Sequence, residues 1–432
     1  MKIYAIGGYS RVEGNMTAVE VENEVIILDC GIEVERWSEM TEEERSFAKD
    51  EELIHLGVIP DDSILRDKEV KAIILSHGHM DHYFAVYWIA RHYNCPIITT
   101  PFVYSLMKKD EYLQQINNPI IRINPGSSYK ISENIEVNFI QAAHSIPQTV
   151  MIFLQTPEGN VLYANDWKFD PYPMLGKRIS YKELKEYEVK VLISDCLRCD
   201  EERRTPSEII AYKMLEDVFS RIDAGAVFLT TFSSHIARIK WMIDLSFQFG
   251  REPILLGRSL LKYMRAAEEL NFVNLKGIRM YRKEKSIKKV LDEVGKNREY
   301  YTIICTGGQG EKGSILRRIA EGTFHFNFSK EDHVIFCNRI IPSPINAANR
   351  YLLESKLKEK GARILKDIHV SGHAAKEDLR DLIRITNPEY FIPTHAGIEK
   401  QAHALELALE EGYEIGKNCF ALANGRVIEI EP

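Results

Sequence analysis

The sequence predicts an α/β protein in which a doubly wound α/β domain is inserted into a domain rich in β-strands. Three observations lead to this prediction. Short apolar strand patterns dominate the start of the chain, helical and strand patterns alternate from about Thr205, and strands that end at a histidine return after about Asn349. A chain of 432 residues also exceeds the usual size of one hydrophobic core, which favours two domains.

Strand patterns open the chain. Residues 2–7 are mostly apolar, "TAVEVE" alternates like a half-buried strand, and "VIILDCG" resembles a buried strand, with a turn at Asn23-Glu24 between them. Residues 33–68 are charged and partly helical, as solvated helix faces are. "VKAIIL" is the next predicted strand, and "YFAVYWIARHY" after it has a helical pattern.

The middle of the chain changes in character. Predicted strands first follow one another in "CPIITT", "IEVNFIQAAHS", "VMIFLQT", "VLYAND" and "VKVLISDC". Helical patterns such as "PSEIIAYKMLEDVFSRI" and "HIARIKWMIDLSFQFG" then alternate with short strands such as "AVFLTTF" and "HVIFCN". This alternation is typical of a doubly wound domain. Near the end, "ARILKDIHVSGH" and "PEYFIPTHAG" again lead from a strand to a histidine.

Composition limits the classes of protein that the chain can belong to. Hydrophobic residues make up 45% and charged residues 28%, as in ordinary globular proteins. We identify no signal peptide and no apolar run long enough to span a bilayer, so we expect no membrane partner. Seven cysteines are too sparse for a disulfide framework, which indicates the cytoplasm. With a net charge of −7, a polyanion site would need a local channel or bound cations.

The stretch "HGHMDH" concentrates metal-binding side chains after a predicted strand. In an extended segment alternate residues face the same side, so His77 and His79 can reach one ion. Asp81 and His82 would turn towards a second ion. Imidazole with carboxylate suits Zn²⁺, and Mn²⁺ when more oxygen ligands are present. Four ligands cannot fill two sites, so the sequence predicts further ligands at other strand ends.

Three later residues are candidates for those ligands. His144 closes "FIQAAH", Asp166 closes "VLYAND", and His395 lies in "YFIPTH". Each follows an apolar run that predicts a buried strand. A single histidine of this kind is more often a core residue than a ligand. The cluster at residues 77–82 reverses that judgement, because its four ligands require partners.

Together these residues resemble the metallo-β-lactamase superfamily, in which an HxHxDH motif is followed by a His, an Asp and a late His. Three stretches narrow the resemblance to the β-CASP branch and to the ribonuclease J family in its shorter, archaeal form: "CTGGQGE" (Cys305–Glu311), "HVSGHA" (His369–Ala374) and "TTFSSHIARI" (Thr230–Ile239). The resemblance covers nearly the whole chain. It implies an αββα sandwich in two parts, residues 1–203 and 350–432, with a β-CASP domain inserted at residues 204–349.

The resemblance also implies roles for the metal ligands. His77, His79 and His144 would hold one ion, while Asp81, His82 and His395 would hold the other. Asp166 would bridge the two. The implied cofactors are two divalent ions, Zn²⁺ or Mn²⁺, which activate a hydroxide and neutralise the scissile phosphate.

Hydrolysis further needs a proton donor for the leaving 3′ oxygen. His373 in "HVSGHA" matches the family residue with that role; alone, such a histidine is more often structural. Asp195 in "LISDC" matches an acidic motif residue that orients a histidine. Asp29, at the end of "VIILD", is a similar orienting candidate.

A third implied element is a grip on the 5′ phosphate of the substrate. Ser234 and His235 align with a family Ser-Asn pair, and Ser371-Gly372 with backbone that meets the phosphate. The chain departs from the bacterial pattern in having His235 for Asn and Ala237 for His. "THAG" also replaces the usual His-Gly-Glu. The glycines of "GGQGE" suit a tight structural turn as well as contact with RNA.

The resemblance implies a ribonuclease that degrades single-stranded RNA from a 5′-monophosphate end in the 5′→3′ direction, with internal cutting as a second mode. It also implies a homodimer. Three alternatives are a DNA-specific nuclease of the same branch, a small-molecule metallo-hydrolase, and a non-catalytic RNA-binding subunit. The pair Cys196 and Cys199 is weak evidence for a metal site. "RKEKSIKK" is typical of a solvated helix face that could border an RNA channel.

Overall fold

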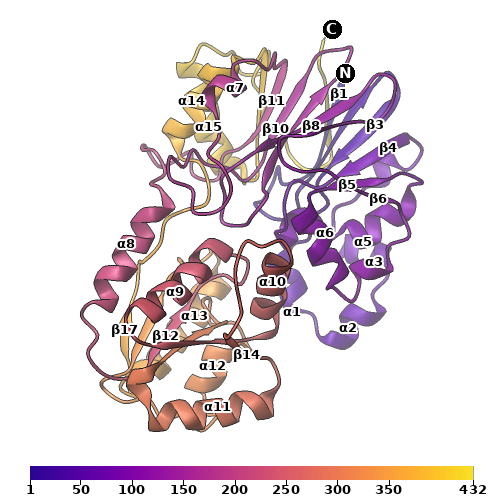
Figure 1. The fold of residues 1–432 in the computed structure, drawn as a ribbon. Coiled ribbons are helices and arrows are strands. Elements are labelled where there is room, and N and C mark those ends of the chain that lie inside the picture. The colour runs from indigo at the N-terminus through magenta and orange to yellow at the C-terminus, as the bar shows by residue number, and fades with distance from the viewer. Residues whose placement is uncertain (432) are drawn as a thin grey trace. The chain divides into compact units, whose positions relative to one another are not determined.

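A computed structural model describes residues 1–431 of the chain (Figure 1). The chain forms two compact units and passes between them twice. Unit 1 comprises Met1–Pro206 and the residues from Ser371 on, and unit 2 comprises Ser207–Val370. Among the helices of residues 1–431, none combines the length and the apolar character that a membrane crossing requires.

Unit 1 contains two β-sheets. The first has seven strands in the order β19 (Arg426–Glu429), β1 (Lys2–Gly7), β2 (Met16–Val21), β3 (Glu24–Leu28), β4 (Glu69–Ile74), β5 (Ile97–Thr99) and β6 (Ile120–Arg122). The second has six strands in the order β18 (Tyr390–Thr394), β11 (Val191–Asp195), β10 (Val161–Ala164), β9 (Val150–Gln155), β8 (Glu136–Gln141) and β7 (Ser128–Lys130).

The two sheets of unit 1 pack face to face. Side chains of both sheets form one core, among them Ile3, Val19 and Ile26 from the first and Val137, Ile152 and Ile193 from the second. The outer face of the second sheet is covered by α7 (Tyr181–Leu184), α14 (Lys376–Thr386) and α15 (Ile398–Glu410) (Figure 1). The remaining helices of unit 1 are α1 (Val34–Glu39), α2 (Glu42–Phe47), α3 (Asp50–His55), α4 (Met80–Tyr83), α5 (Val86–Ile89) and α6 (Pro101–Lys108).

Unit 2 is built on one parallel sheet. Its order is β14 (Arg279–Tyr281), β13 (Glu252–Leu256), β15 (Tyr301–Cys305), β12 (Val227–Thr230), β16 (His333–Phe336) and β17 (Arg363–Leu365). Its helices are α8 (Glu208–Phe219), α9 (Ile236–Gln248), α10 (Arg258–Glu269), α11 (Glu284–Lys296), α12 (Ile315–Ala320) and α13 (Pro344–Glu359).

Both faces of this parallel sheet are buried, as is usual for such sheets. Phe228 packs in a core with side chains of α11, α12 and α13. Its neighbours Val227 and Leu229 point to the opposite face and are also buried, and α9 and α10 contact β13. The predicted fold class, a two-sheet sandwich with an inserted doubly wound domain, is therefore confirmed.

Three local features of the structure differ from the sequence prediction. The second passage between the units falls at residues 370/371 rather than 349/350, because β17 pairs with β16 of unit 2. The hairpin between β2 and β3 turns at Glu22 and Asn23, which both have positive φ, instead of Asn23-Glu24. The helical pattern after β4 forms the two short helices α4 and α5 instead of one.

Candidate metal centre

The candidate ligands of unit 1 lie where strands end. His77 and His79 follow β4, and Asp81 and His82 lie on α4. His144 follows β8, Asp166 follows β10, and His395 follows β18 directly. Because β3 with β4, and β10 with β11 and β18, are parallel pairs, their carboxyl ends bring these segments together. The structure thus places all seven predicted ligands in two neighbouring groups.

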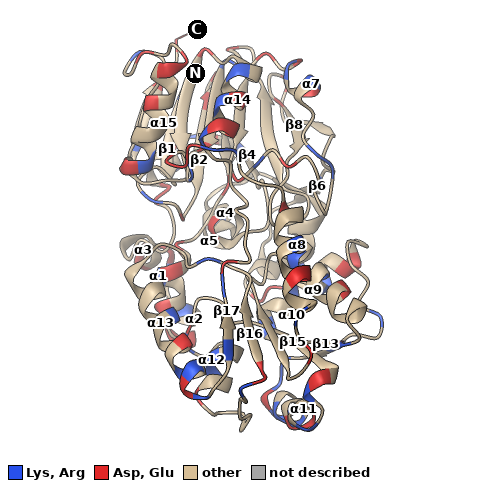
Figure 2. Ribbon diagram, turned by 90° about the vertical axis from the view of Figure 1, so that its left-hand side faces the viewer, with Lys and Arg blue, Asp and Glu red and all other residues tan. Residues whose placement is uncertain are grey.

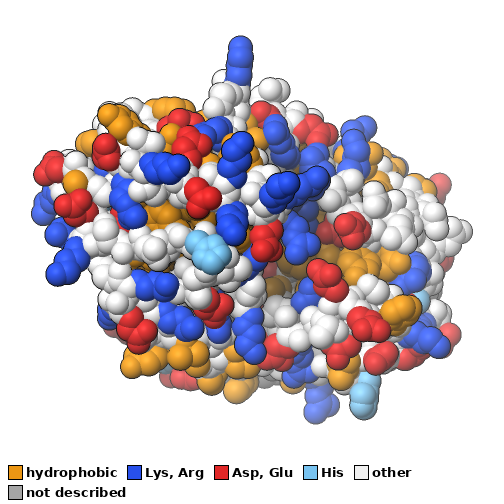
Figure 3. All heavy atoms as spheres, turned by 90° about the horizontal axis from the view of Figure 1, so that it is seen from below, with side chains coloured by type: hydrophobic (Ala, Val, Ile, Leu, Met, Phe, Trp, Pro, Cys, Tyr) orange, Lys and Arg blue, Asp and Glu red, His pale blue; other side chains and the backbone are white. Residues whose placement is uncertain are grey.

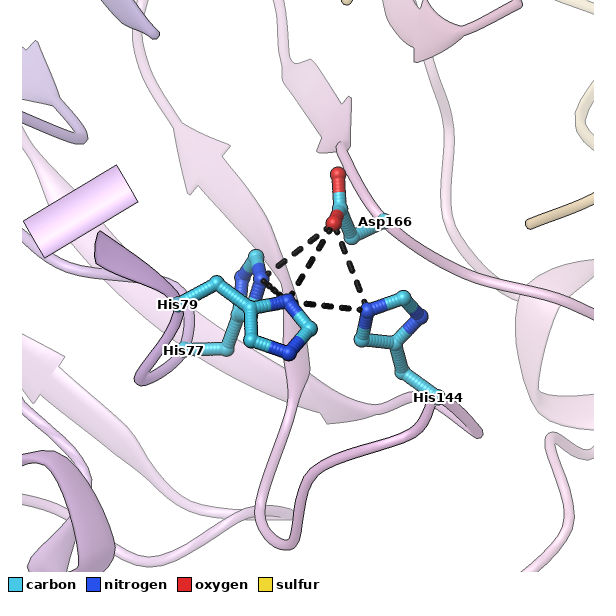
Figure 4. A group of neighbouring side chains, drawn as sticks. All are labelled: His77, His79, His144 and Asp166. Carbon is cyan, nitrogen blue, oxygen red and sulfur yellow. Dashed lines mark hydrogen bonds and ion pairs between the residues drawn. The ribbon is translucent and has the colours of Figure 1, made fainter. Parts of the chain in front are cut away.

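The first group surrounds one carboxylate oxygen (Figure 4). Oδ2 of Asp166 lies 3.3 Å from Nε2 of His77, 3.7 Å from Nδ1 of His79 and 3.3 Å from Nε2 of His144. His79 Nδ1 is also 3.1 Å from His77 Nε2 and 3.2 Å from His144 Nε2. Four donors at bond lengths of 2.0–2.1 Å around a tetrahedral cation stand roughly 3.3–3.4 Å apart. The spacing therefore fits a tetrahedral cation.

The second group faces the other oxygen of the same carboxylate. Oδ1 of Asp166 lies 3.2 Å from Nε2 of His82 and 3.4 Å from Nε2 of His395. Asp81 Oδ2 is 3.5 Å from His82 Nε2. Oδ1 of Asp166 is buried and accepts no hydrogen bond from residues 1–431. A buried carboxylate oxygen without a donor is costly, and a cation at this position would satisfy it.

Hydrogen bonds on the far side of each ring orient the imidazoles. His82 Nδ1 donates to Asp29 Oδ2 at 2.8 Å, and His144 Nδ1 donates to the carbonyl oxygen of Gly372 at 2.8 Å. Asn15 Oδ1 lies 3.2 Å from His395 Nδ1. A proton held on Nδ1 leaves the Nε2 lone pair for a cation, as in many metal-binding histidines.

Asp29 organises the first group as well. Ser76 donates to its two carboxylate oxygens, from the backbone N–H and from Oγ, both at 2.8 Å. Ser76 Oγ lies 3.0 Å from His77 Nδ1 and accepts a hydrogen bond from it, because the hydroxyl itself donates to Asp29. The expected orienting position of Asp29 is therefore matched by its direct contact with His82 and by its link through Ser76 to His77.

Three of the residues in this centre adopt a left-handed backbone conformation. Asp29, Asp166 and His395 have φ values of 61°, 56° and 58°. Such values cost energy for residues with a side chain, and they cluster at functional sites where the surrounding structure enforces them. The strain here turns three polar side chains from the strand ends towards one point.

Burial sets the charge of the histidines. It lowers the pKa of His77 to about 4, with the nearby His82 adding to the shift. It also lowers the pKa of His144 well below its ordinary value, and that of His395 below it. These imidazoles are neutral at pH 7, the state that binds metal ions.

Neighbouring charges shift the pKa values of Asp81, Asp166 and His82. For Asp81 and Asp166 burial acts to raise the pKa, but the surrounding imidazoles, chiefly His82 and His395, outweigh it and hold both pKa values below the usual range. Burial acts to lower the pKa of His82, yet the carboxylates of Asp166 and Asp81 raise it well above its ordinary value. A cation would therefore replace a proton at His82.

His373 lies beside this centre. Its ring is 5.1 Å from that of His144 and is stacked 5.2 Å from that of His395. Its Nδ1 donates to Asp195 Oδ2 at 2.8 Å. Burial acts to lower the pKa of His373, but the carboxylates of Asp195 and Asp166 outweigh it and raise that pKa. The predicted pairing of Asp195 with a histidine is present, and Nε2 of His373 is the nitrogen left for other contacts.

The expected phosphate-binding residues lie in both units. In unit 1, Ser371 Oγ accepts from the backbone N–H of His373 at 3.1 Å, and a Cβ at Gly372 would come within 2.8 Å of the His144 ring. In unit 2, Ser234 is partly exposed, whereas His235 is buried and its Nδ1 accepts from the N–H of Arg238. His235 thus caps α9, which favours a structural role for its ring.

The glycine-rich stretch at residues 305–311 is packed within unit 2. A Cβ at Gly308 would lie 2.6 Å from the side chain of Asn338, and one at Gly310 would lie 2.4 Å from the carbonyl of Asn349. Arg350 donates to the carbonyl of Gly308. These close approaches leave no room for a Cβ atom, which explains the glycines by a tight structural turn. Cys196 and Cys199 are both buried free thiols.

Sequence reasoning did not identify the amides beneath the centre. Besides His395, Asn15 contacts the carbonyl of Asp81 and Nε2 of His82, at 3.1 and 3.2 Å. Asn165 lies 3.3 Å from Asn15 Oδ1 and donates to the hydroxyl of Tyr163. The available signal was position alone, because Asn15 directly precedes a strand and Asn165 directly precedes Asp166.

Comparisons with known proteins agree with this geometry. Three family models match the chain: "Metallo-beta-lactamase superfamily" at residues 9–184, "Ribonuclease J, beta-CASP domain" at 224–354, and "Zn-dependent metallo-hydrolase RNA specificity domain" at 360–421. The first and third models fall mainly in unit 1, and the second lies within unit 2. Together they span the fold and the centre just described.

Curated relatives match over the full length. Ribonuclease J of Pyrococcus abyssi is 46% identical over 441 residues, covering 100% of this chain and 97% of the relative. Ribonuclease J of Methanocaldococcus jannaschii is 43% identical, covering 100% and 99%. Ribonuclease J of Mycoplasma genitalium is 28% identical and covers 99% of this chain and 73% of the relative. A crystal structure of an Enterococcus faecalis protein of unknown function matches the fold with a TM-score of 0.67 at 16% identity, covering 99% of both chains.

Proposed function

Because the chain belongs to the ribonuclease J family, we propose that it is a metal-dependent ribonuclease that degrades single-stranded RNA from a 5′-monophosphate end in the 5′→3′ direction. The observation that carries this proposal is the pair of donor groups on either side of the Asp166 carboxylate. Such a pair is the arrangement that in-line phosphodiester hydrolysis uses.

We propose that His77, His79 and His144 would hold one divalent cation and that Asp81, His82 and His395 would hold another. Asp166 would be shared by both. Near-tetrahedral spacing with imidazole and carboxylate donors favours Zn²⁺, with Mn²⁺ as the alternative. When bound, the cations would supply a nucleophile from water near neutral pH and offset the charge of the phosphate.

The leaving group requires a proton from this chain. Breaking the bond between phosphorus and O3′ leaves an electron pair on O3′, and His373 Nε2 is the proton donor that we propose for it. The hydrogen bond from Nδ1 to Asp195 fixes the ring and stabilises its protonated form. Asp195 therefore acts through His373 and needs no contact with RNA.

Charge supports RNA as the substrate. Unit 2 contains 28 Lys and Arg but only 19 Asp and Glu, a net charge of +9, although the whole chain is at −7. Figure 2 colours these residues along the ribbon, with Lys and Arg in blue and Asp and Glu in red. Lys and Arg side chains gather on the face shown in Figure 3. Around the start of α11 the exposed basic residues are Arg282, Lys283, Lys285, Lys288 and Lys289. Such a surface suits a phosphate backbone.

We further propose that Ser234, Ser371 and the backbone at Gly372 contribute donors to the 5′ phosphate. The family resemblance also supports a homodimer, which sedimentation would test. All seven cysteines are free thiols, which supports a reducing compartment such as the cytoplasm.

The test is cleavage of RNA labelled at its 5′ end. Purified protein with Zn²⁺ or Mn²⁺ is expected to release a labelled mononucleotide from 5′-monophosphate RNA but not from 5′-triphosphate RNA. Asp81→Ala and His373→Ala should abolish release without unfolding the chain, whereas Asp67→Ala and His403→Ala, which change more exposed residues, should not. Cleavage by the Asp81→Ala/His373→Ala double variant would exclude the mechanism. Preference for single-stranded DNA would instead favour a DNA nuclease.

A further inference from the structure

The guanidinium of Arg238 is buried in unit 2 and uses every N–H that it has. Only 1% of the residue is exposed. Nε and Nη2 donate to Glu208 at 2.8 and 2.7 Å, and Nη2 also donates to the carbonyl of Val370 at 3.1 Å. Nη1 contacts the carbonyl of Cys337 at 2.7 Å and Nδ1 of His369 at 2.8 Å. A buried cation with all five donors engaged is rigidly held.

The partners of Arg238 lie next to both passages of the chain between the units. Glu208 comes just after the first passage, at residues 206/207, and Val370 just before the second, at 370/371. We call residues 369–374 the return segment. Arg238 therefore ties the start of the return segment to the segment by which the chain enters unit 2.

The other end of the return segment is fixed within unit 1, beside the metal centre. The carbonyl of Gly372 accepts from His144, and Nδ1 of His373 donates to Asp195. The carbonyl of His373 accepts from Thr205 Oγ1 at 2.7 Å, and the N–H of Ala374 donates to the carbonyl of Trp167 at 2.7 Å. Along the chain, Val370, which Arg238 holds, directly precedes the residues that are held within unit 1.

We propose that Arg238 is a positioning residue for His373: by holding His369 and Val370 it fixes the start of the return segment that carries the proton donor. This inference rests on the proposed role of His373 in RNA hydrolysis. Arg238 itself contacts no reacting atom, because its guanidinium is closed off by protein partners. Its loss leaves the start of the segment unfixed, so the contacts within unit 1 alone must hold His373 and align its imidazole with O3′ less precisely.

Lysine cannot replace Arg238 in this role. An ammonium group has three donors at one point, whereas the guanidinium spans a carboxylate, two carbonyls and a ring nitrogen. Arg238→Lys keeps the positive charge beside Glu208 but cannot hold all four partners. The expected effect is a lower kcat with little change in KM, because the contacts of unit 2 with RNA remain.

A change of leaving group separates loss of the proton donor from general damage. The substrate is 5′-monophosphate RNA whose first linkage carries sulfur in place of the 3′ oxygen. A thiol has a pKa of roughly 8.5, so a thiolate leaves without being protonated. His373→Ala should slow the oxygen substrate by about 10²- to 10⁴-fold but the sulfur substrate far less. Arg238→Lys should show the same pattern, at about tenfold or more.

The matched control is Arg251→Lys. Arg251 is another buried arginine of unit 2, and it donates to the carbonyls of Gly225 and Tyr301 and not to the return segment. Its rate ratio of sulfur to oxygen substrate should equal that of the wild type. His369→Ala is the second variant if Arg238→Lys does not fold, and it should shift the ratio in the same direction by a smaller factor.

The outcomes are distinguishable. No RNA cleavage by the wild type would overturn the proposed function. A normal wild type and a sulfur-rescued His373→Ala, together with unchanged ratios for Arg238→Lys and His369→Ala, would overturn only the role of Arg238. Equal slowing of both substrates in Arg238→Lys would also overturn it, because that result indicates general structural damage.

Discussion

The two units of the chain differ in charge and in what they bury. Unit 1 has 28 basic and 44 acidic residues, a net charge of −16, whereas unit 2 has 28 basic and 19 acidic residues, a net charge of +9. The value of −7 for the whole chain is the sum of these two opposite charges and so conceals the difference between the units. Net charge per domain is thus the more informative quantity when the partner is a polyanion.

The two units also differ in the partners of their buried charged groups. In unit 1 they converge on Asp166 and leave one of its oxygens without a hydrogen-bond donor. In unit 2 the buried arginines Arg238, Arg251 and Arg350 donate to backbone carbonyls, and Arg238 and Arg350 also donate to glutamates, so protein groups satisfy their charge. This contrast supports the proposal that unit 1 carries the chemistry and that unit 2 attracts RNA electrostatically.

The variant Asp166→Asn tests whether the carboxylate shared by the two donor groups of unit 1 is needed for cleavage. The amide keeps the size of the side chain but removes the charge that both donor groups share. Cleavage should fall by more than the roughly 10- to 100-fold cost of losing a residue that only orients a ligand. Bound metal, measured by mass spectrometry, should fall with it, while RNA binding by unit 2 in a filter assay should persist.

The control is Asp170→Asn, which removes another buried carboxylate from the same loop. Asp170 pairs with Lys168 at 3.3 Å and belongs to neither donor group. This variant should keep its metal. If Asp166→Asn retained both metal and cleavage, the shared carboxylate would have no role in the reaction.

The second prediction concerns the basic surface of unit 2. Replacing Lys283, Lys285, Lys288 and Lys289 by glutamine should weaken RNA binding and leave kcat at saturating RNA unchanged. The slope of log Kd against log salt should fall by about 0.7 for each lysine that contacts a phosphate. Titration of a labelled RNA at several salt concentrations measures both quantities.

The same loss of charge in unit 1 is the matched comparison. Lys177, Arg178, Lys182 and Lys185 are exposed basic residues on α7 and directly beside it in sequence. Glutamine at these four positions should leave the salt slope unchanged. Equal slopes for the two quadruple variants would mean that RNA responds to the total charge of the protein and not to the surface of unit 2.

The metal centre was predictable because its signal is local. Four donors within residues 77–82 imply further ligands, and His144, Asp166 and His395 each follow an apolar run that predicts a strand. Asn15 and Arg238 gave no comparable signal. An asparagine before a strand is an ordinary turn residue, and a lone arginine in a helical pattern is normally exposed. Their importance depends on burial and on contacts with residues distant in sequence.

The fold was predictable from the alternation of apolar segments, but the end of unit 2 was not. The strand β17 is short, and its sequence does not show that it pairs with β16 rather than with a strand of unit 1. His235 illustrates the same limit. Its position matches a phosphate-binding residue by alignment, yet its ring turns inward and caps α9. Side-chain direction at a helix start is set by packing, which the sequence does not state.

The last prediction concerns a small change in stability and compares a buried histidine of each unit. In unit 1, burial lowers the pKa of His77 within a donor group that a cation would satisfy. In unit 2, burial and then Arg363 lower the pKa of His333, whose Nδ1 is buried without a hydrogen-bond partner in residues 1–431. His333 should therefore affect stability only. Its contribution is complete above the unfolded pKa of about 6.5 and is lost as pH falls towards the lower folded value, at about 1.4 kcal/mol for each unit of difference.

Hydrogen exchange of β16 and β12, followed from pH 7 to pH 5 and corrected for the intrinsic rate, tests this sign. In the wild type the opening free energy of these strands should fall over that range, and His333→Gln should remove part of the fall because glutamine does not titrate. His325→Asn is the control: His325 is an exposed histidine of unit 2 with φ 56°, a conformation that asparagine tolerates. It should leave the pH dependence unchanged. An equal loss of pH dependence in both variants would show that burial does not set the titration of His333, and the contrast between the buried histidines of the two units would then fail.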